Sequence, residues 1–247
     1  MCTGKARDDA AGRATYRARS QVSRRTSKWP IVRIIGGAGV TQTIIGLNVL
    51  VLLLMYATGR PTAPQTLLQF GALPSPLPKS EWWRMITAMF VHIGLLHLLF
   101  NVWALMLFGP ALEERYGRPR FLIVYIVSGI SGSAFSLAFT GAGLAAGASG
   151  AVFGILGAWL AFFVRHRNVP ALRGQLRSLL FLIGINLAFG ATAGHIDNFA
   201  HVGGLVAGFA IGAALEWSSR KVRPLSWAGA LAGTLILAAA LAIPHMV

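Results

Sequence analysis

Long apolar runs, separated by short polar segments, dominate the chain from residue 40 onward. Many approach the roughly 20 residues that a helix needs to cross the hydrocarbon core of a bilayer. The fold class predicted by this pattern is all-α, a polytopic bundle of membrane helices. The expected spans are residues 40–56, 93–108, 121–139, 149–163, 179–193, 198–215 and 226–243.

The segment between the first two expected spans, residues 58–92, differs from an ordinary linker. It contains five prolines together with Trp82, Trp83 and Arg84. Aromatic residues are enriched where a protein meets the membrane surface. We therefore expect a folded loop at the membrane interface here, whereas residues 1–34 are predicted to be a disordered basic tail.

The composition agrees with membrane insertion. Hydrophobic residues make up 55% of the chain, charged residues only 12%, and the mean hydropathy is +0.64. A soluble domain usually has about 25% charged residues. The single cysteine, Cys2, excludes an internal disulfide and a cysteine-based zinc site.

The net charge of +15 arises from the positions of the 22 lysines and arginines. Most lie in the N-terminal tail and in the segments on the same side of the membrane, and only Arg60, Lys79 and Arg84 lie on the other side. This bias predicts a cytoplasmic N-terminus and an external C-terminus. The charge is therefore topological, and no nucleic-acid partner is expected.

Two polar residues stand near the starts of the fourth and sixth expected spans. Ser149 lies in the sequence Gly-Ala-Ser-Gly at 147–150, and His201 is followed by Val-Gly-Gly. Both spans would enter from the outer face, so the two side chains would lie at similar depth. A serine among glycines is usually a packing residue, but an ionisable residue in a span is a functional candidate. A histidine can serve as general base for a serine nucleophile, so the pair is interpreted as a catalytic dyad.

Glycines four apart in both spans would let these helices pack closely. They include Gly150 and Gly154 in one span, and Gly204 and Gly208 in the other. Phe153 shares a helix face with Ser149, so its ring is expected against the histidine. Asp197, one turn before His201, is interpreted as a helix cap in preference to the acid of a triad.

His97 and Asn101 lie four residues apart on one face of the second expected span. Neutral donors on one face are what an oxyanion hole requires, and the backbone N–H of Ser149 would be a third donor. The alternative is a structural hydrogen-bond pair between helices. We expect His92 to support the loop, and Glu113 and Arg115 to form structural contacts on the cytoplasmic side.

Taken together, these blocks resemble the rhomboid family of intramembrane serine proteases over residues of about 80–215. The residues that carry the resemblance are Trp83, Arg84, His92, His97, Asn101, Glu113, Arg115, Gly147, Ala148, Ser149, Gly150, His201, Val202, Gly203 and Gly204. The resemblance implies a six-helix core, with a seventh helix after it, and no metal or cofactor. It implies Ser149 as nucleophile, His201 as base, and an oxyanion hole of His97, Asn101 and the Ser149 backbone. Phe153 departs from the family, in which many members have tyrosine.

The predicted organisation is therefore a tail at 1–34, a catalytic core at 35–216, and a basic inner loop with the seventh helix at 217–247. Gly147, Gly150, Phe153 and Gly204 would support the site. The expected function is cleavage of single-span transmembrane proteins near the outer face of a lipid bilayer, in a prokaryotic plasma membrane. The alternatives are a non-catalytic rhomboid-like adaptor that binds transmembrane segments, and a transporter, against which the lack of carboxylates in the spans argues. No sequence feature indicates an oligomeric state.

Overall fold

The computed structural model describes residues 39–193, 196–217 and 223–247. Residues Ala38–Val247 form one compact unit. The predicted tail at 1–34 lies outside the described residues, as does most of the basic loop after the sixth span. The predicted division of the chain at residues 34 and 216 therefore stays a prediction.

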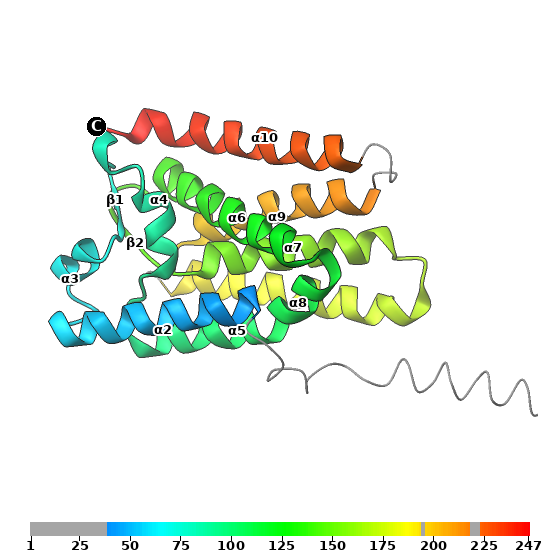
Figure 1. Ribbon diagram of the computed structural model, residues 1–247, viewed down its shortest axis with the longest axis horizontal. Coiled ribbons are helices and arrows are strands. Elements are labelled where there is room, and N and C mark those ends of the chain that lie inside the picture. The colour runs from blue at the N-terminus through cyan, green and yellow to red at the C-terminus, as the bar shows by residue number, and fades with distance from the viewer. Residues whose placement is uncertain (1–38, 194–195, 218–222) are drawn as a thin grey trace, which may run out of the picture. The chain divides into compact units, whose positions relative to one another are not determined.

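In the part of the chain that the structure describes, seven long helices lie at the positions of the seven expected spans, which confirms the helical membrane fold (Figure 1). Six of them are long and apolar enough to cross a bilayer, and α7 is shorter, at 17 residues. Their bounds are α2(Val40–Thr58), α5(Gly94–Tyr116), α6(Arg118–Phe139), α7(Ser149–Arg165), α8(Pro170–Thr192), α9(Asn198–Trp217) and α10(Arg223–Ala242).

Two helices extend beyond the apolar runs that predicted them. The residues between the second and third expected spans, 109–120, do not form a loop as those spans implied, because α5 continues through Pro110 to Tyr116 and α6 begins at Arg118. Gly117 alone joins the two helices, with a φ of 81° that favours glycine. Helix α8 likewise begins at Pro170, nine residues before the expected span, because polar helical turns do not register in a hydropathy pattern.

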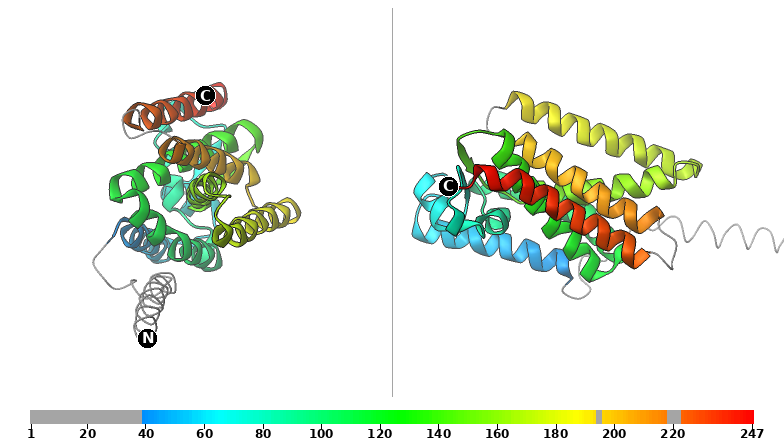
Figure 2. Two further views of the ribbon diagram at one scale, coloured as in Figure 1. Left: turned by 90° about the vertical axis from the view of Figure 1, so that its right-hand side faces the viewer. Right: turned by 90° about the horizontal axis from the view of Figure 1, so that it is seen from above.

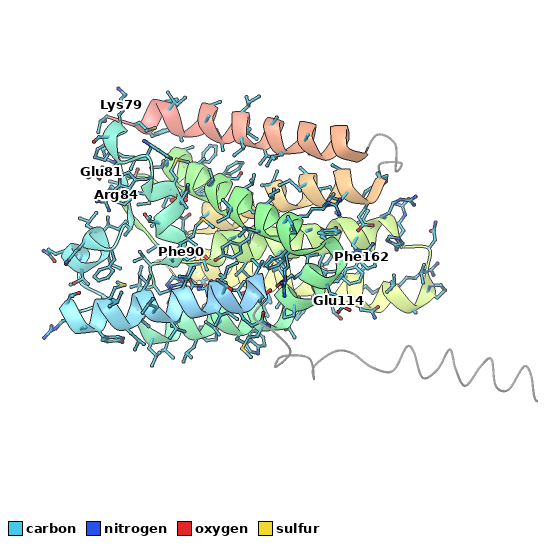
Figure 3. The ribbon with its side chains drawn as sticks, in the orientation of Figure 1. Lys79, Glu81, Arg84, Phe90, Glu114 and Phe162 are labelled. Carbon is cyan, nitrogen blue, oxygen red and sulfur yellow. The ribbon has the colours of Figure 1, made fainter. Side chains whose placement is uncertain are left out.

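The segment between α2 and α5, called the first loop (residues 59–93), is folded, as expected. It contains α3(Pro64–Gln69), β1(Leu73–Ser75), η1(Lys79–Glu81), α4(Arg84–Thr87) and η2(Ala88–Phe90). The buried guanidinium of Arg84 holds it together by donating to the carbonyls of Leu68 and Ala72 and to the carboxylate of Glu81. Figure 3 shows Glu81 and Arg84 side by side in this loop.

Strand β1 extends the first loop toward a second loop, which precedes α7. It pairs antiparallel with β2(Gly143–Ala145), with Leu73 opposite Ala145. Only Ala146, Gly147 and Ala148 separate β2 from the first residue of α7. The two-stranded sheet therefore links the first loop to the start of this helix.

Helix α7 packs against α5, α6, α8 and α9 (Figure 2). Its closest neighbour is α9, and the glycine stripes account for this. A Cβ atom at Gly204 would overlap the backbone carbonyl of Gly150, and one at Gly208 would overlap that of Gly154. The two backbones are thus in direct contact, which only glycine permits at these positions.

Charged residues tie the helices at the end of the bundle opposite the start of α7. Arg115 donates two hydrogen bonds to Glu216, at 2.9 and 2.8 Å, which joins the last turns of α5 and α9. The Glu113 carboxylate accepts hydrogen bonds from the backbone N–H groups of Val40 and Thr41, at 2.8 and 2.9 Å. The structural contacts expected of Glu113 and Arg115 are therefore present.

Candidate active site

Ser149 is the first residue of α7, and His201 lies in the first turn of α9. The Oγ atom of Ser149 is 3.0 Å from Nε2 of His201. The two side chains come from residues 52 positions apart in the sequence, and the parallel entry of α7 and α9 brings them together. The distance is within the range that a general base needs to take the serine proton.

The glycines beside Ser149 and His201 set how closely the two helices approach. Gly132 of α6 also belongs to this contact, because a Cβ atom there would lie 2.8 Å from the carbonyl oxygen of Ala200 and 3.4 Å from Cα of Gly150. Sequence reasoning overlooked Gly132, although the small residues around it in the third span were a visible signal. Three helices therefore meet at glycines just below the paired serine and histidine.

Phe153 lies one turn below Ser149 and stacks on the imidazole of His201. The ring centroids are 4.2 Å apart, and the ring planes differ by 6°. This is the contact expected from the shared helix face of Phe153 and Ser149. The stack fixes the plane of the imidazole and leaves its edge directed at the serine.

Asp197 caps α9, as interpreted from the sequence. Its Oδ1 accepts hydrogen bonds from the backbone N–H of Ala200 and from the hydroxyl of Thr140, both at 3.0 Å. The Nδ1 atom of His201 has no hydrogen-bond partner among the described residues. The geometry is therefore that of a serine and histidine pair in which the nearby carboxylate serves the backbone.

His97 faces the turn that precedes Ser149. Its Nδ1 accepts a hydrogen bond from the N–H of Ile93 at 3.3 Å, which leaves the proton of a neutral imidazole on Nε2. A Cβ atom at Gly147 would lie 2.7 Å from this Nε2, so the donor edge of His97 lies against the backbone of the turn. Gly147 has a φ of 129°, which also favours glycine.

Asn101 is buried one turn further along α5. One N–H of its amide donates to the carbonyl of His97 at 2.9 Å, and the second N–H of the same amide remains available to another acceptor. The backbone N–H of Ser149 is also without an intrahelical acceptor, because it belongs to the first turn of α7. Nε2 of His97 therefore lies against the turn before Ser149, and the Asn101 amide lies one turn further along α5, hydrogen-bonded to the carbonyl of His97.

Two bonds from the first loop hold the turn before Ser149 in place. Gly147 donates its N–H to the carbonyl of Ala88 at 2.9 Å, and Ala148 donates to Nε2 of His92 at 3.4 Å. His92 is fully buried. This burial, together with the neighbouring imidazole of His97, lowers the pKa of His92 to about 3, so the ring is neutral. These contacts agree with the loop-supporting role that was expected for His92. The contact of Ala88 could not be predicted from the sequence, because only its backbone carbonyl takes part.

The bundle of apolar helices defines an integral membrane protein, and the serine and histidine paired at one end have the geometry found in serine hydrolases. The Rhomboid domain model matches residues 79–218, more than half of the chain. The chain belongs to the rhomboid family, as its sequence blocks suggested.

Individual relatives agree with this assignment. The chain is 43% identical to Rhomboid protease GluP of Bacillus subtilis (strain 168), over 71% of this chain and 34% of that protein. It is 41% identical to RHOMBOID-like protein 1 of Arabidopsis thaliana, over 60% of this chain and 38% of that protein. It is 37% identical to Rhomboid-like protease 2 of Toxoplasma gondii, over 63% and 56%. The matches thus cover about a third to a half of the length of these relatives.

Proposed function

We propose that this protein is an intramembrane serine protease that uses Ser149 and His201 as a catalytic dyad. The observation that carries the proposal is the 3.0 Å approach of the Ser149 hydroxyl to Nε2 of His201, at the head of two membrane helices. Two of the relatives described above are named proteases, and their similarity supports the same class of reaction.

In the proposed mechanism, the Ser149 oxygen attacks the carbonyl carbon of the scissile peptide bond as His201 takes the hydroxyl proton. The oxyanion of the tetrahedral intermediate accepts hydrogen bonds from the Ser149 backbone, Nε2 of His97 and the amide of Asn101. The intermediate collapses, the C–N bond breaks, and His201 gives its proton to the leaving amine. Water then attacks the acyl-serine, His201 takes its proton and returns it to the serine oxygen, and the carboxylic acid product leaves.

The proposed substrates are single-span membrane proteins, cut in or near their transmembrane segment close to the outer face. The site supports this class because it lies within one end of a helical bundle whose outer surface is apolar. Hydrolysis consumes water that bare lipid does not supply, so the site must lie near an aqueous surface. The cytoplasmic N-terminus and the location in a prokaryotic plasma membrane remain part of this proposal.

Labelling with a fluorophosphonate probe tests the dyad directly. The purified protein should be labelled on Ser149. Both Ser149→Ala and His201→Ala should abolish labelling, and both variants should still unfold at the temperature of the wild-type protein. The conversion of a single-span model substrate should be lost in the same two variants. Labelling that survives His201→Ala at the wild-type rate would contradict the assignment of the base. A folded wild-type protein that is neither labelled nor active would point to the non-catalytic adaptor.

A further inference from the structure

The residues that follow the seventh helix pair with the first loop. Leu77 donates its N–H to the carbonyl of His245 at 3.1 Å, and Val247 donates to the carbonyl of Leu77 at 2.8 Å. Lys79 donates its N–H to the carbonyl of Val247 at 2.7 Å, and Leu77 and Met246 form a parallel β-bridge. Figure 1 shows the end of α10 beside β1, and Figure 3 shows Lys79 at the same place.

Apolar packing joins the same parts. One cluster contains Leu73 and Leu77 of the first loop, which are buried, together with Ala238 and Ala242 of α10. Met246 and Ala145 of β2 pack against this cluster. The pairing is therefore not an isolated contact of a chain end, since the helix before it and both strands beside it share one core.

This contact continues toward the nucleophile. Leu77 lies two residues after the end of β1, and β1 pairs with β2 through Leu73 and Ala145. Two residues after Ala145 lies Gly147, whose backbone touches the His97 ring, and two residues later lies Ser149. Backbone pairings, joined by short covalent links at Pro76 and at residues 146–148, thus connect residues 245–247 to the start of α7.

We propose that residues 245–247 are a positioning strand, through which the seventh helix holds the first loop and β2 in the register that the active site requires. The inference rests on the proposed function for its catalytic consequence. When the strand is released, the turn at 147–148 would sample positions in which Ser149 and the His97 donor are misaligned. Turnover would then scale with the paired fraction of the protein, whereas substrate binding elsewhere would be unchanged.

Proline substitutions can remove single backbone donors of the pairing without loss of packed side chains. Lys79 is exposed and begins the 3₁₀ helix η1, a position that suits proline, and Pro78 before it has a ψ of 132°, which a following proline requires. Val247 is likewise exposed, and Met246 has a ψ of 127°. The variants Lys79→Pro and Val247→Pro each delete one bond, and Lys79→Ala and Val247→Ala keep it.

We expect each proline variant to lower the equilibrium constant for pairing about fivefold, the value of one hydrogen bond, so that kcat falls by up to about fivefold with KM little changed. Each alanine variant should stay within about twofold of wild type, as is usual for exposed positions. The double proline variant should lose at least the product of the two single effects, because both deletions lower the equilibrium constant of the same paired state. Proline and alanine variants with equal kcat would overturn the proposal.

Amide hydrogen exchange separates this proposal from the proposed function. Lys79→Pro should speed exchange in residues 143–149, which lie outside the mutated segment, whereas Lys79→Ala should not. Faster exchange there in a protein that proves inactive would keep the positioning strand and reject the protease. Unchanged exchange in residues 143–149 would overturn the strand even if cleavage is observed.

Discussion

The rings of Phe153 and His201 lie parallel at 4.2 Å, and both side chains are almost fully buried, at 5% and 7% exposure. The stack leaves the imidazole one orientation in which Nε2 meets the Ser149 hydroxyl. A base must hold such a geometry to take a proton during attack. The apolar ring of Phe153 is sufficient for this purpose, so the stack needs no hydroxyl at this position.

Replacement of Phe153 by leucine should therefore lower kcat about fivefold, since an aromatic pair contributes about 1 kcal/mol beyond its buried area. Phe153→Tyr keeps the stack and should retain most of the wild-type rate. Steady-state cleavage of a model substrate, with kcat and KM determined separately, measures both. A Phe153→Leu enzyme with unchanged kcat would show that other contacts orient the imidazole.

Gly147→Ala should impair catalysis more than stability. A Cβ atom at this position would lie 2.6 Å from Cε1 of His97, and the φ of 129° disfavours any side chain. We expect kcat to fall by on the order of 100-fold, as for the loss of one oxyanion donor. The control is Gly143→Ala, where a Cβ atom has nothing within 4 Å. Equal activity of the two variants would contradict the steric argument.

Hydropathy and two short motifs were enough to predict the helical fold and the meeting of Ser149 with His201. The reason is that topology alone places the starts of the fourth and sixth spans at one surface, and glycine stripes draw them together. The sequence did not predict the contacts that are made by backbone atoms alone. Neither the carbonyl of Ala88 nor the pairing of Leu77 with Met246 depends on side-chain chemistry, so no residue type marks them in the sequence.

The end of α5 illustrates the same limit. The apolar run stops near Phe108, and Pro110 suggests a break, yet the helix continues to Tyr116. The extension is stabilised by tertiary contacts of Glu113 and Arg115 with α2 and α9, which local propensity does not reveal. Tertiary packing therefore overrode the local signal at this position.

His97→Ala and Asn101→Ala should each lower kcat more than they raise KM. Both side chains offer a donor that is needed only when charge develops on the oxyanion, and each is expected to contribute about 3 kcal/mol to the transition state. Cleavage kinetics with a saturable substrate separate the two parameters. A change confined to KM would assign the pair to substrate binding or to helix packing instead.

Glu113→Gln should destabilise the fold without changing the chemistry of the site. The carboxylate accepts bonds from the N–H of Val40, the N–H of Thr41 and the Thr41 hydroxyl at the start of α2, and an amide replaces one of its acceptor oxygens with a donor. The loss of a charged cap is expected to cost about 1–2 kcal/mol of unfolding free energy. The neighbouring Glu114, which is exposed, provides the matched control, and Glu114→Gln should unfold at the wild-type temperature. Figure 3 shows Glu114 at this end of the bundle.

The unfolding free energy should fall on acidification because His92 is buried in its neutral form. Its pKa is about 3 in the folded protein and 6.5 in an unfolded chain, so between these values the unfolded state binds a proton that the folded state does not. The contribution to stability is therefore complete above pH 6.5 and is lost as the pH falls from 6.5 toward 3, at up to about 1.4 kcal/mol per pH unit.

His92→Gln removes this titration and keeps an acceptor for the N–H of Ala148. From pH 7.5 to pH 5.5 the wild-type protein should lose about 1.4 kcal/mol more unfolding free energy than the variant. Thermal or denaturant unfolding at both pH values measures the difference, whatever the stability of the variant at neutral pH. Groups that titrate in both proteins cancel in this comparison. Equal losses would mean that His92 gains its proton in the folded state, and that the bond to Ala148, which requires an unprotonated Nε2, opens with acid.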